Sequence, residues 1–162
     1  MVSLHLVHCA LAASLVGAVS PADWPQWAGS SYRNNASEAK DIPTDWAPGK
    51  FDRQTGQWDS AQARHIQWVA RLGSQTYGSP VVAGGRVWVG TNNGAGYLTR
   101  YPARVDLGCL LCFQEADGHF LWQHSSEKLP DGAIDWPLQG ICCAPLVEGD
   151  RLWYVTSRGE VV

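Results

Sequence analysis

The sequence predicts an all-β fold, and three observations support this prediction. Short runs of valine, leucine and aromatic residues alternate with glycine-containing turns, as is typical of strands in a sheet. Helix signals are sparse, because 17 glycines and 9 prolines interrupt the chain every few residues. A stretch in the middle of the chain also returns near its end, which indicates a repeated structural unit.

The clearest strands form one predicted unit within residues 78–122. Each strand is a run of apolar, β-branched or aromatic residues next to a turn signal. One turn is Ala83-Gly84-Gly85, and another is Asp117-Gly118, which readily supplies the positive φ of a tight hairpin. The four strands are expected at residues 81–82, 87–89 and 110–113, and from residue 120 to 122 onward.

Residues 145–153 repeat residues 80–88 at an offset of 65, with Pro, Val, Gly, Arg and Trp in the same places. Two unrelated hairpins are the alternative, but turn chemistry does not demand the recurring Arg and Trp. Repeats with four strands each are typical of β-propeller blades, here lengthened by loop insertions. A ring of about four to eight blades needs more units than the roughly two in this chain. We therefore expect a fragment whose remaining blades are missing; a complete chain would end in an open edge strand.

Residues 1–22 have the features of a signal peptide, although Lys and Arg are missing near the start. Residues 4–19 are mostly apolar and small residues follow, so we expect cleavage after Ser20 or Ala22. The apolar run is short for a membrane span, and none is expected after signal removal. An uncleaved anchor or a wrongly assigned start is the alternative. The mature protein is expected in the periplasm or outside the cell.

Residues 23–60 are expected to form an N-terminal strap, and residues 61–162 the incomplete blades. No helix or strand period is visible before residue 50, so the strap should cross the surface of the β-fold. The blade region begins with an expected strand at residues 66–70, and loop insertions are expected at residues 92–106 and 125–140. Three tryptophans are expected to anchor the strap: Trp24, Trp27 and Trp46.

Nine tryptophans in a chain with one methionine are unusual. A recurring large flat side chain is expected where each blade wedges against its neighbour. Trp88 and Trp122 are therefore expected to be buried between blades.

Several motifs resemble those of secreted proteins with pyrroloquinoline-quinone-type (PQQ-like) β-propeller repeats, which are frequent in planctomycete-like bacteria. The family repeat Ala-x-Asp-x-x-Thr-Gly-x-x-x-Trp is matched at Gly118 and Trp122, whereas Cys112, Gln114 and Asp117 stand in its other three places. Many proteins with this repeat are non-enzymatic scaffolds, among them the propeller lipoprotein of outer-membrane assembly. The other motifs are Asp23-Trp24-Pro25-Gln26-Trp27, Ile66-Gln67-Trp68 and Ser79-Pro80-Val81-Val82.

The adjacent cysteines Cys142 and Cys143 are the sharpest chemical feature. In quinoprotein alcohol dehydrogenases such a pair forms a strained disulfide ring over the cofactor, so the resemblance makes both residues candidate cofactor-binding residues for PQQ, with calcium. An exported setting permits this oxidation. The pair leads directly into a repeat strand, however, and no Glu, Asn and Asp set for calcium can be assigned. A pair of small buried strand residues is the competing interpretation.

The other candidate groups match no site pattern. Cys109 and Cys112 have C-x-x-C spacing, but Phe113 stands where haem attachment requires His. Strand positions three apart also point to opposite faces, which disfavours a shared zinc ion. Cys112 is expected to form a structural disulfide with Cys142 or Cys143. The scattered histidines His65, His119 and His124 are expected to be solvated or to pack. The loop carboxylates Asp131 and Asp135 are expected to be solvated, and no metal site is expected.

A net charge of −3 without a basic patch disfavours nucleic acid as a partner. The residues and the resemblance together favour a non-catalytic exported scaffold or binding module for a protein or a polysaccharide. The alternative is a fragment of a PQQ- and calcium-dependent alcohol dehydrogenase. That enzyme would need calcium ligands and a catalytic Asp in blades outside this chain.

Overall fold

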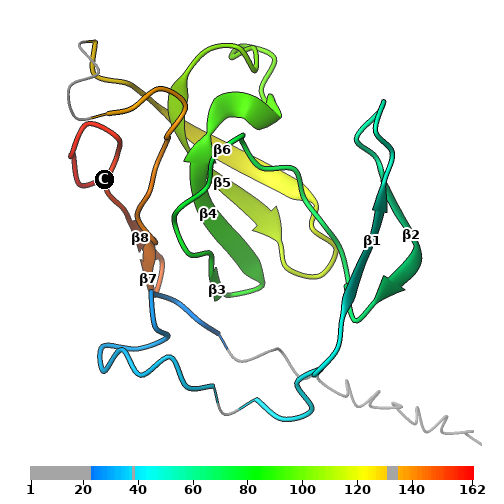
Figure 1. Cartoon of the computed structure of the whole chain (residues 1–162). Coiled ribbons are helices and arrows are strands. Elements are labelled where there is room, and N and C mark those ends of the chain that lie inside the picture. Colours follow the sequence, from blue (N-terminus) through cyan, green and yellow to red (C-terminus); the bar gives the residue numbers. More distant parts are fainter. Residues whose placement is uncertain (1–22, 38, 131–134) are drawn as a thin grey trace, which may run out of the picture.

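The computed structural model describes residues 23–37, 39–130 and 135–162. The signal peptide expected at residues 1–22 lies outside the described residues, as does Asp131. The described chain is all-β, as predicted, and its strands form three separate antiparallel sheets (Figure 1). A single short 3₁₀ turn, η1 at Asn93–Ala95, is its only helical element.

The central sheet contains the four strands that the sequence predicted in one unit. Its strands are consecutive neighbours in the order β3-β4-β5-β6 (Figure 1). They are longer than predicted, so that residues 125–127, expected in a loop insertion, extend β6. The strands are β3 (Val81–Ala83), β4 (Arg86–Asn92), β5 (Leu107–Gln114) and β6 (Phe120–Glu127).

The two predicted turns of this sheet are confirmed. Gly84 and Gly85, with φ of 56° and 73°, join β3 to β4. Gly118 joins β5 to β6 with a φ of 72°, and an added Cβ there would lie 2.5 Å from the Trp68 ring. Glycine is therefore required at position 118 by the backbone conformation and by the packed tryptophan.

One row of side chains crosses the whole central sheet. Val81 is opposite Trp88, Trp88 is opposite Cys112, and Cys112 is opposite Trp122. Directly opposed residues share a face, so the two tryptophans lie on the same side of the sheet. Trp88 is 6 % exposed, as expected, whereas Trp122 is 37 % exposed, so the expectation that Trp122 is buried is wrong for this chain. The described segments cover the β3–β4 half of the row more fully than the β6 end.

The opposite face of the sheet carries a second apolar cluster. Phe113 lies at its centre, with the Tyr97 ring 5.7 Å away edge-on and the Phe120 ring 6.1 Å away. Tyr97 and Phe120 stack at 4.2 Å. Burial on both faces explains why seven consecutive residues of β5 are buried, instead of every second one. The buried members of this cluster are Val89, Leu107, Cys109, Leu111 and Phe113.

The repeated segment forms a second hairpin where the sequence predicted it. It consists of β7 (Leu146–Glu148) and β8 (Arg151–Trp153). Val147 and Leu152 pack against the face of the central sheet that carries Trp88. The two repeated segments thus lie in two sheets that pack face to face. Closure of such sheets into a propeller ring remains a prediction.

A third hairpin lies where the sequence predicted only a strap. It comprises β1 (Ala47–Phe51) and β2 (Trp58–Arg64) and crosses the expected boundary at residue 60 (Figure 1). Its turn was predicted: Asp52 accepts hydrogen bonds from the backbone N–H of Gln54 (2.9 Å) and Thr55 (2.6 Å). Ala47-Pro48-Gly49-Lys50 carries no β-branched residue, so nothing local indicated that β1 would pair.

Residues 66–70 do not form the strand that the sequence predicted. Their polar side chains bond instead to the β5–β6 turn: Gln67 Nε2 donates to the Ala116 carbonyl (2.6 Å), and Trp68 Nε1 to the Glu115 carbonyl (2.6 Å). No described strand pairs with their backbone. The alternation of polar and apolar residues at 66–70 therefore reflects side-chain packing over the Phe113 cluster and not backbone pairing in a sheet.

The start of the strap joins the two repeated sheets. The Trp24 backbone pairs with Val82, with N···O distances of 2.6 and 3.0 Å, and the Pro25 carbonyl accepts from the Val147 N–H (2.8 Å). Anchoring by Trp24 is consistent with this pairing. Trp27 and Trp46 are 51 % and 66 % exposed, so the expectation that they anchor the strap is wrong.

Three polar residues are buried at the end of β4, where a loop insertion was expected to begin at residue 92. Thr91, Asn92 and Asn93 are at most 2 % exposed. Their amide and hydroxyl groups bond to the backbone of three different connecting segments, and so replace water there. The bonds include Ser74 N–H to Asn92 Oδ1 (3.1 Å), Asn93 Nδ2 to the Pro102 carbonyl (2.9 Å) and Asn92 Nδ2 to the Leu138 carbonyl. The backbone carbonyl of Thr91 also accepts from the Ile141 N–H (3.1 Å).

Trp88→Ala is expected to lower the free energy of unfolding by about 3–5 kcal/mol, because truncation of a buried ring leaves a cavity between the sheets. Denaturant unfolding followed by far-UV circular dichroism measures the loss. Trp46→Ala is the matched control, since this ring is 66 % exposed. The control should change stability by about 0.5 kcal/mol or less, and equal effects of the two variants would contradict the prediction.

Candidate functional site

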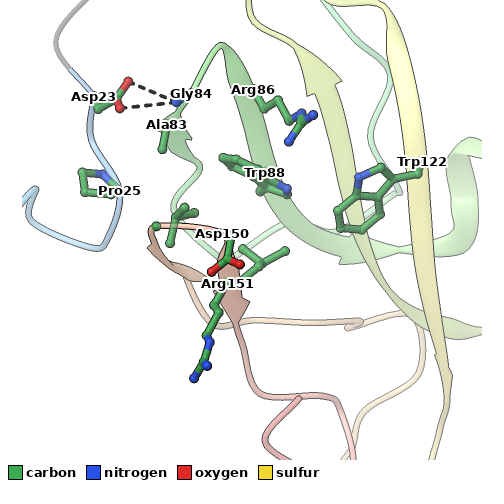
Figure 2. A pocket seen from close by; sticks show the side chains of 12 residues that line it. Asp23, Pro25, Ala83, Gly84, Arg86, Trp88, Trp122, Asp150 and Arg151 are labelled. Atoms are coloured by element: carbon green, nitrogen blue, oxygen red, sulfur yellow. Dashed lines mark hydrogen bonds between the residues drawn. The ribbon is translucent and has the colours of Figure 1, made fainter.

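A cleft of about 550 Å³ lies between the central sheet and the β7–β8 hairpin. We call it the repeat cleft, because both repeated segments contribute to it. Figure 2 shows the β3–β4 turn on one side, the β7–β8 turn below and Trp122 of β6 at the far end. Its polar and charged lining residues are Asp23, Arg86, Trp88, Trp122, Asp150 and Arg151.

The positively charged group inside this cleft comes from the first repeat. Arg86 follows the Gly84-Gly85 turn, and Figure 2 shows its side chain above Trp88 on the same strand. Arg151 stands at the repeated position after Gly149-Asp150, but its guanidinium extends away from the cleft (Figure 2). Among the described residues neither arginine forms an ion pair. A guanidinium keeps its charge at every physiological pH, so Arg86 offers a permanent, forked set of donors.

Trp88 provides a donor that no described residue uses. The side chain is 6 % exposed, and its Nε1 is buried without a hydrogen-bond partner. Figure 2 shows this nitrogen on the side of the ring that faces Trp122. A buried N–H without a partner costs about 1–3 kcal/mol, so an acceptor placed in the cleft would recover that energy. Trp122, 37 % exposed, adds a flat apolar surface beside it.

The carboxylates of the cleft have different surroundings. Both carboxylate oxygens of Asp23 lie 3.3 Å from the Gly84 nitrogen, so that Asp23 is held against the β3–β4 turn (Figure 2). Asp150 lines the cleft from the β7–β8 turn. The cleft thus combines one cation, two anions, an unused indole donor and an aromatic face. These are groups that bind and orient a polar chain.

The predicted pair Cys142 and Cys143 lies elsewhere, in a second pocket of about 350 Å³. Burial and the nearby Asp135 carboxylate raise the pKa of the Cys142 thiol. Cys143 Sγ accepts a hydrogen bond from the Val155 N–H at 3.2 Å. All four described cysteines are free thiols, so the expected disulfide of Cys112 is not formed. The competing interpretation, small buried strand residues, does not hold for Cys142, which is exposed.

The Asp135 carboxylate, which lines this second pocket, belongs to a buried ion pair. Lys128 Nζ lies 2.6 Å from Asp135 Oδ1, with side chains only 11 % and 4 % exposed. Lys128 also donates to the Trp136 carbonyl (2.6 Å), while Asp106 accepts from the Leu138 N–H (2.8 Å). The expectation that Asp135 is solvated is therefore wrong. The sequence analysis did not predict this pair, in which Lys128 directly follows the last residue of β6.

The second pocket does not fit the quinone cofactor that the resemblance implied. PQQ is a polyanion, whereas the pocket presents the Asp135 carboxylate, whose second oxygen has no partner, and the uncharged Ser157 hydroxyl. Lys128, the nearest cation, is already bonded to Asp135. Among residues 23–37, 39–130 and 135–162, no cluster of three or more His, Cys, Asp or Glu side chains could hold a metal ion. The described residues therefore supply neither half of the site.

Two of the histidines make local contacts, one packed and one exposed. His124 of β6 hydrogen-bonds to the Tyr154 hydroxyl, and the two rings meet edge-on at 5.6 Å. Burial raises the pKa of Tyr154 to about 12. His65 bonds to the Asp45 carbonyl (2.7 Å) at the exposed base of the β1–β2 hairpin.

Sequence reasoning found the strands that build the repeat cleft but not the cleft itself. One signal was present, because the recurring Gly-x-Arg-x-Trp order placed Arg86 and Trp88 together after a turn. Asp23 could not be found in this way, since it approaches Gly84 from 61 residues away in the chain.

No protein-family model matches the chain, and a search of curated proteins finds no match.

Lys128→Met is expected to cost about 3–5 kcal/mol of unfolding free energy, because it leaves the Asp135 charge buried without a partner. The matched control is Arg64→Met, which breaks the Arg64–Asp45 pair at the surface (2.8 Å, 63 % and 55 % exposed). Its expected cost is about 0–1 kcal/mol. Denaturant titrations of both variants provide the measurement, and a control as damaging as Lys128→Met would contradict the buried pair's role.

Stability is expected to fall as the pH rises from about 9 to 11. Burial raises the pKa of Cys109 and of Cys112 to about 11, from 9.0. Between these two pH values the unfolded chain loses thiol protons that the folded chain keeps, so ionisation pulls the equilibrium toward unfolding. Urea midpoints measured from pH 8 to 11 test this. Cys112→Ala should flatten the decline, and an unchanged slope would contradict the assignment.

Proposed function

We propose that this chain is an exported, non-catalytic binding module of the PQQ-like β-propeller type, which holds a protein or polysaccharide partner in the repeat cleft. Propeller units are proposed because two segments with the same sequence pattern form hairpins that pack face to face. Export is proposed from residues 1–22. In the described part of the chain no helix is both long and apolar enough to cross a membrane.

The observation that carries this proposal is the unused Trp88 donor between Arg86 and Trp122. Hot spots of binding surfaces are enriched in tryptophan and arginine, which combine apolar area with fixed donors. Trp88 and Arg86 sit two residues apart on one strand, so the sheet holds their relative positions rigidly. The carbonyl and carboxylate groups of a polypeptide can accept hydrogen bonds from these donors. The hydroxyl or carboxylate groups of a polysaccharide can do so too.

Arg86→Ala is expected to weaken partner binding about tenfold or more, because one charge-assisted hydrogen bond contributes about 1.5–3 kcal/mol. The full chain is titrated with polygalacturonate, with dextran and with reduced, carboxymethylated casein as an extended polypeptide, and tryptophan emission is recorded. Arg53→Ala is the control, because Arg53 is exposed in the β1–β2 turn. Failure of all three probes, or an Arg86→Ala variant with wild-type affinity, would contradict the proposal.

A further inference from the structure

The second pocket offers hydrogen-bond acceptors that no described donor fills. Asp135 lines it with a side chain that is only 4 % exposed. Its Oδ1 is bonded to Lys128 Nζ (2.6 Å), whereas its Oδ2 is buried and has no hydrogen-bond partner among the described residues. The Ser157 hydroxyl, which also belongs to the pocket lining, is likewise buried without a described partner. Buried polar groups are almost always hydrogen-bonded, so these two atoms mark a place for a ligand.

Two backbone carbonyls add to this set of acceptors. Gln139 and Gly140 line the pocket, and the Cys142 thiol contacts their carbonyl oxygens at 3.9 and 3.7 Å. A thiol is a weak donor, so each carbonyl can still accept a stronger hydrogen bond. Burial raises the pKa of Cys142, which keeps this thiol uncharged at neutral pH. The pocket therefore needs donors, and a ligand has to supply them.

The charge balance beside the pocket is negative. Lys128 Nζ lies 2.6 Å from an oxygen of Asp135 and 3.9 Å from an oxygen of Asp106, so one ammonium group faces two carboxylates. Asp106 also has a buried oxygen, Oδ1, without a partner in the described part of the chain. A buried charge without a counter-charge is costly. A ligand with one positive charge would balance the second carboxylate.

The geometry at Asp135 distinguishes between the two common organic cations. A guanidinium pairs with a carboxylate through two parallel N–H groups, which use both oxygens. Only Oδ2 of Asp135 is available, because Lys128 is bonded to Oδ1. An ammonium is a compact charge with three separate donors, which match one carboxylate oxygen, one hydroxyl and one carbonyl. A primary ammonium group is therefore favoured.

The pocket wall is fixed by the rest of the fold. Leu138 has a φ of 62°, a left-handed conformation that is rare for residues other than glycine. Its N–H donates to Asp106 Oδ2 (2.8 Å), and its carbonyl accepts from Asn92 Nδ2. At Gly140, with a φ of 69°, an added Cβ would lie 2.3 Å from the Thr91 carbonyl oxygen. The carbonyls that follow Leu138 are thus held against the buried end of β4, so binding requires little ordering of this wall.

We propose that the second pocket binds a primary alkylammonium group, which donates hydrogen bonds to Asp135 Oδ2, to the Ser157 hydroxyl and to a backbone carbonyl. A volume of about 350 Å³ is within the range of small-molecule sites, so the alkyl chain has room beside Val155. A free amine and a lysine side chain of a polypeptide present the same group. The site shares no residue with the repeat cleft, so binding there is independent of the proposed function.

The test titrates the full chain with pentylamine at neutral pH by isothermal titration calorimetry. Pentanol has the same alkyl chain without the charge, and pentyltrimethylammonium keeps the charge without N–H donors. We expect saturable binding of pentylamine, with both analogues at least tenfold weaker. The second arm uses Nα-acetyl-lysine methylamide, which carries the ammonium group on a peptide unit. Binding at least as tight as that of pentylamine assigns the pocket to a lysine side chain, and weaker binding assigns it to a free amine.

Asp135→Asn is expected to weaken pentylamine binding tenfold or more, because it removes the carboxylate charge. Asp41→Asn, at an exposed carboxylate, is the matched control and should leave the affinity unchanged. Asp135→Asn also leaves Lys128 buried without its partner, so circular dichroism checks the folding of this variant. Ser157→Ala removes a hydroxyl that bonds to no described residue, and it remains decisive if Asp135→Asn unfolds. We expect Ser157→Ala to weaken binding about threefold or more.

Three results would overturn the proposal. Pentanol or pentyltrimethylammonium that binds as tightly as pentylamine would show that the pocket does not recognise a charged donor. Wild-type affinity in a folded Asp135→Asn variant, or in Ser157→Ala, would place the amine elsewhere on the molecule. Absence of saturable binding for both pentylamine and the lysine derivative would exclude an ammonium site.

Discussion

The buried polar end of β4 is the constraint on which the rest of the structure depends. Thr91, Asn92 and Asn93 hold the connecting segments before β3, before β5 and before β7 through hydrogen bonds to their backbones. Buried backbone groups in connecting segments must find partners, and side-chain amides, with two donors and an acceptor, can supply several at once. Because all three segments meet at the end of β4, this strand end positions the segments that cover the two faces of the central sheet.

The repeat cleft follows from unequal coverage of the two faces. Residues 66–72, together with Tyr97, close the face that carries Phe113, whereas the two-stranded β7–β8 hairpin covers only part of the face that carries Trp88. A two-stranded sheet is too narrow to cover a row that runs across four strands. The uncovered part is where the Trp88 donor and the Trp122 ring come together.

The repeat cleft and the pocket of Cys142 and Cys143 differ in electrostatics, and this separates their chemistry. In the repeat cleft the Arg86 charge is unpaired among the described residues, and the Trp88 N–H adds a second donor. In the pocket of Cys142 and Cys143, the nearby Lys128 ammonium is bonded to Asp135, and burial raises the pKa of Cys142. A raised pKa leaves a smaller fraction of Cys142 as thiolate. Cys142 is therefore less reactive than a cysteine in an exposed loop would be. A partner with acceptor or carboxylate groups is therefore favoured in the repeat cleft.

By itself, the sequence determined the all-β class, the strands at 81–89, 110–122 and 146–153, and the turns at Gly84-Gly85 and Gly118. Periodicity and glycine conformation are local properties, readable without knowing what lies opposite. Tertiary structure decided the rest. Only packing could bury Asn92, Asn93 and Asp135, expose Trp27 and Trp46, pair β1 with β2 and leave residues 66–70 unpaired. Burial and pairing depend on which distant segment covers a side chain. The repeat cleft belongs to this second group, since it joins Asp23, Arg86 and Asp150 from three separate parts of the chain.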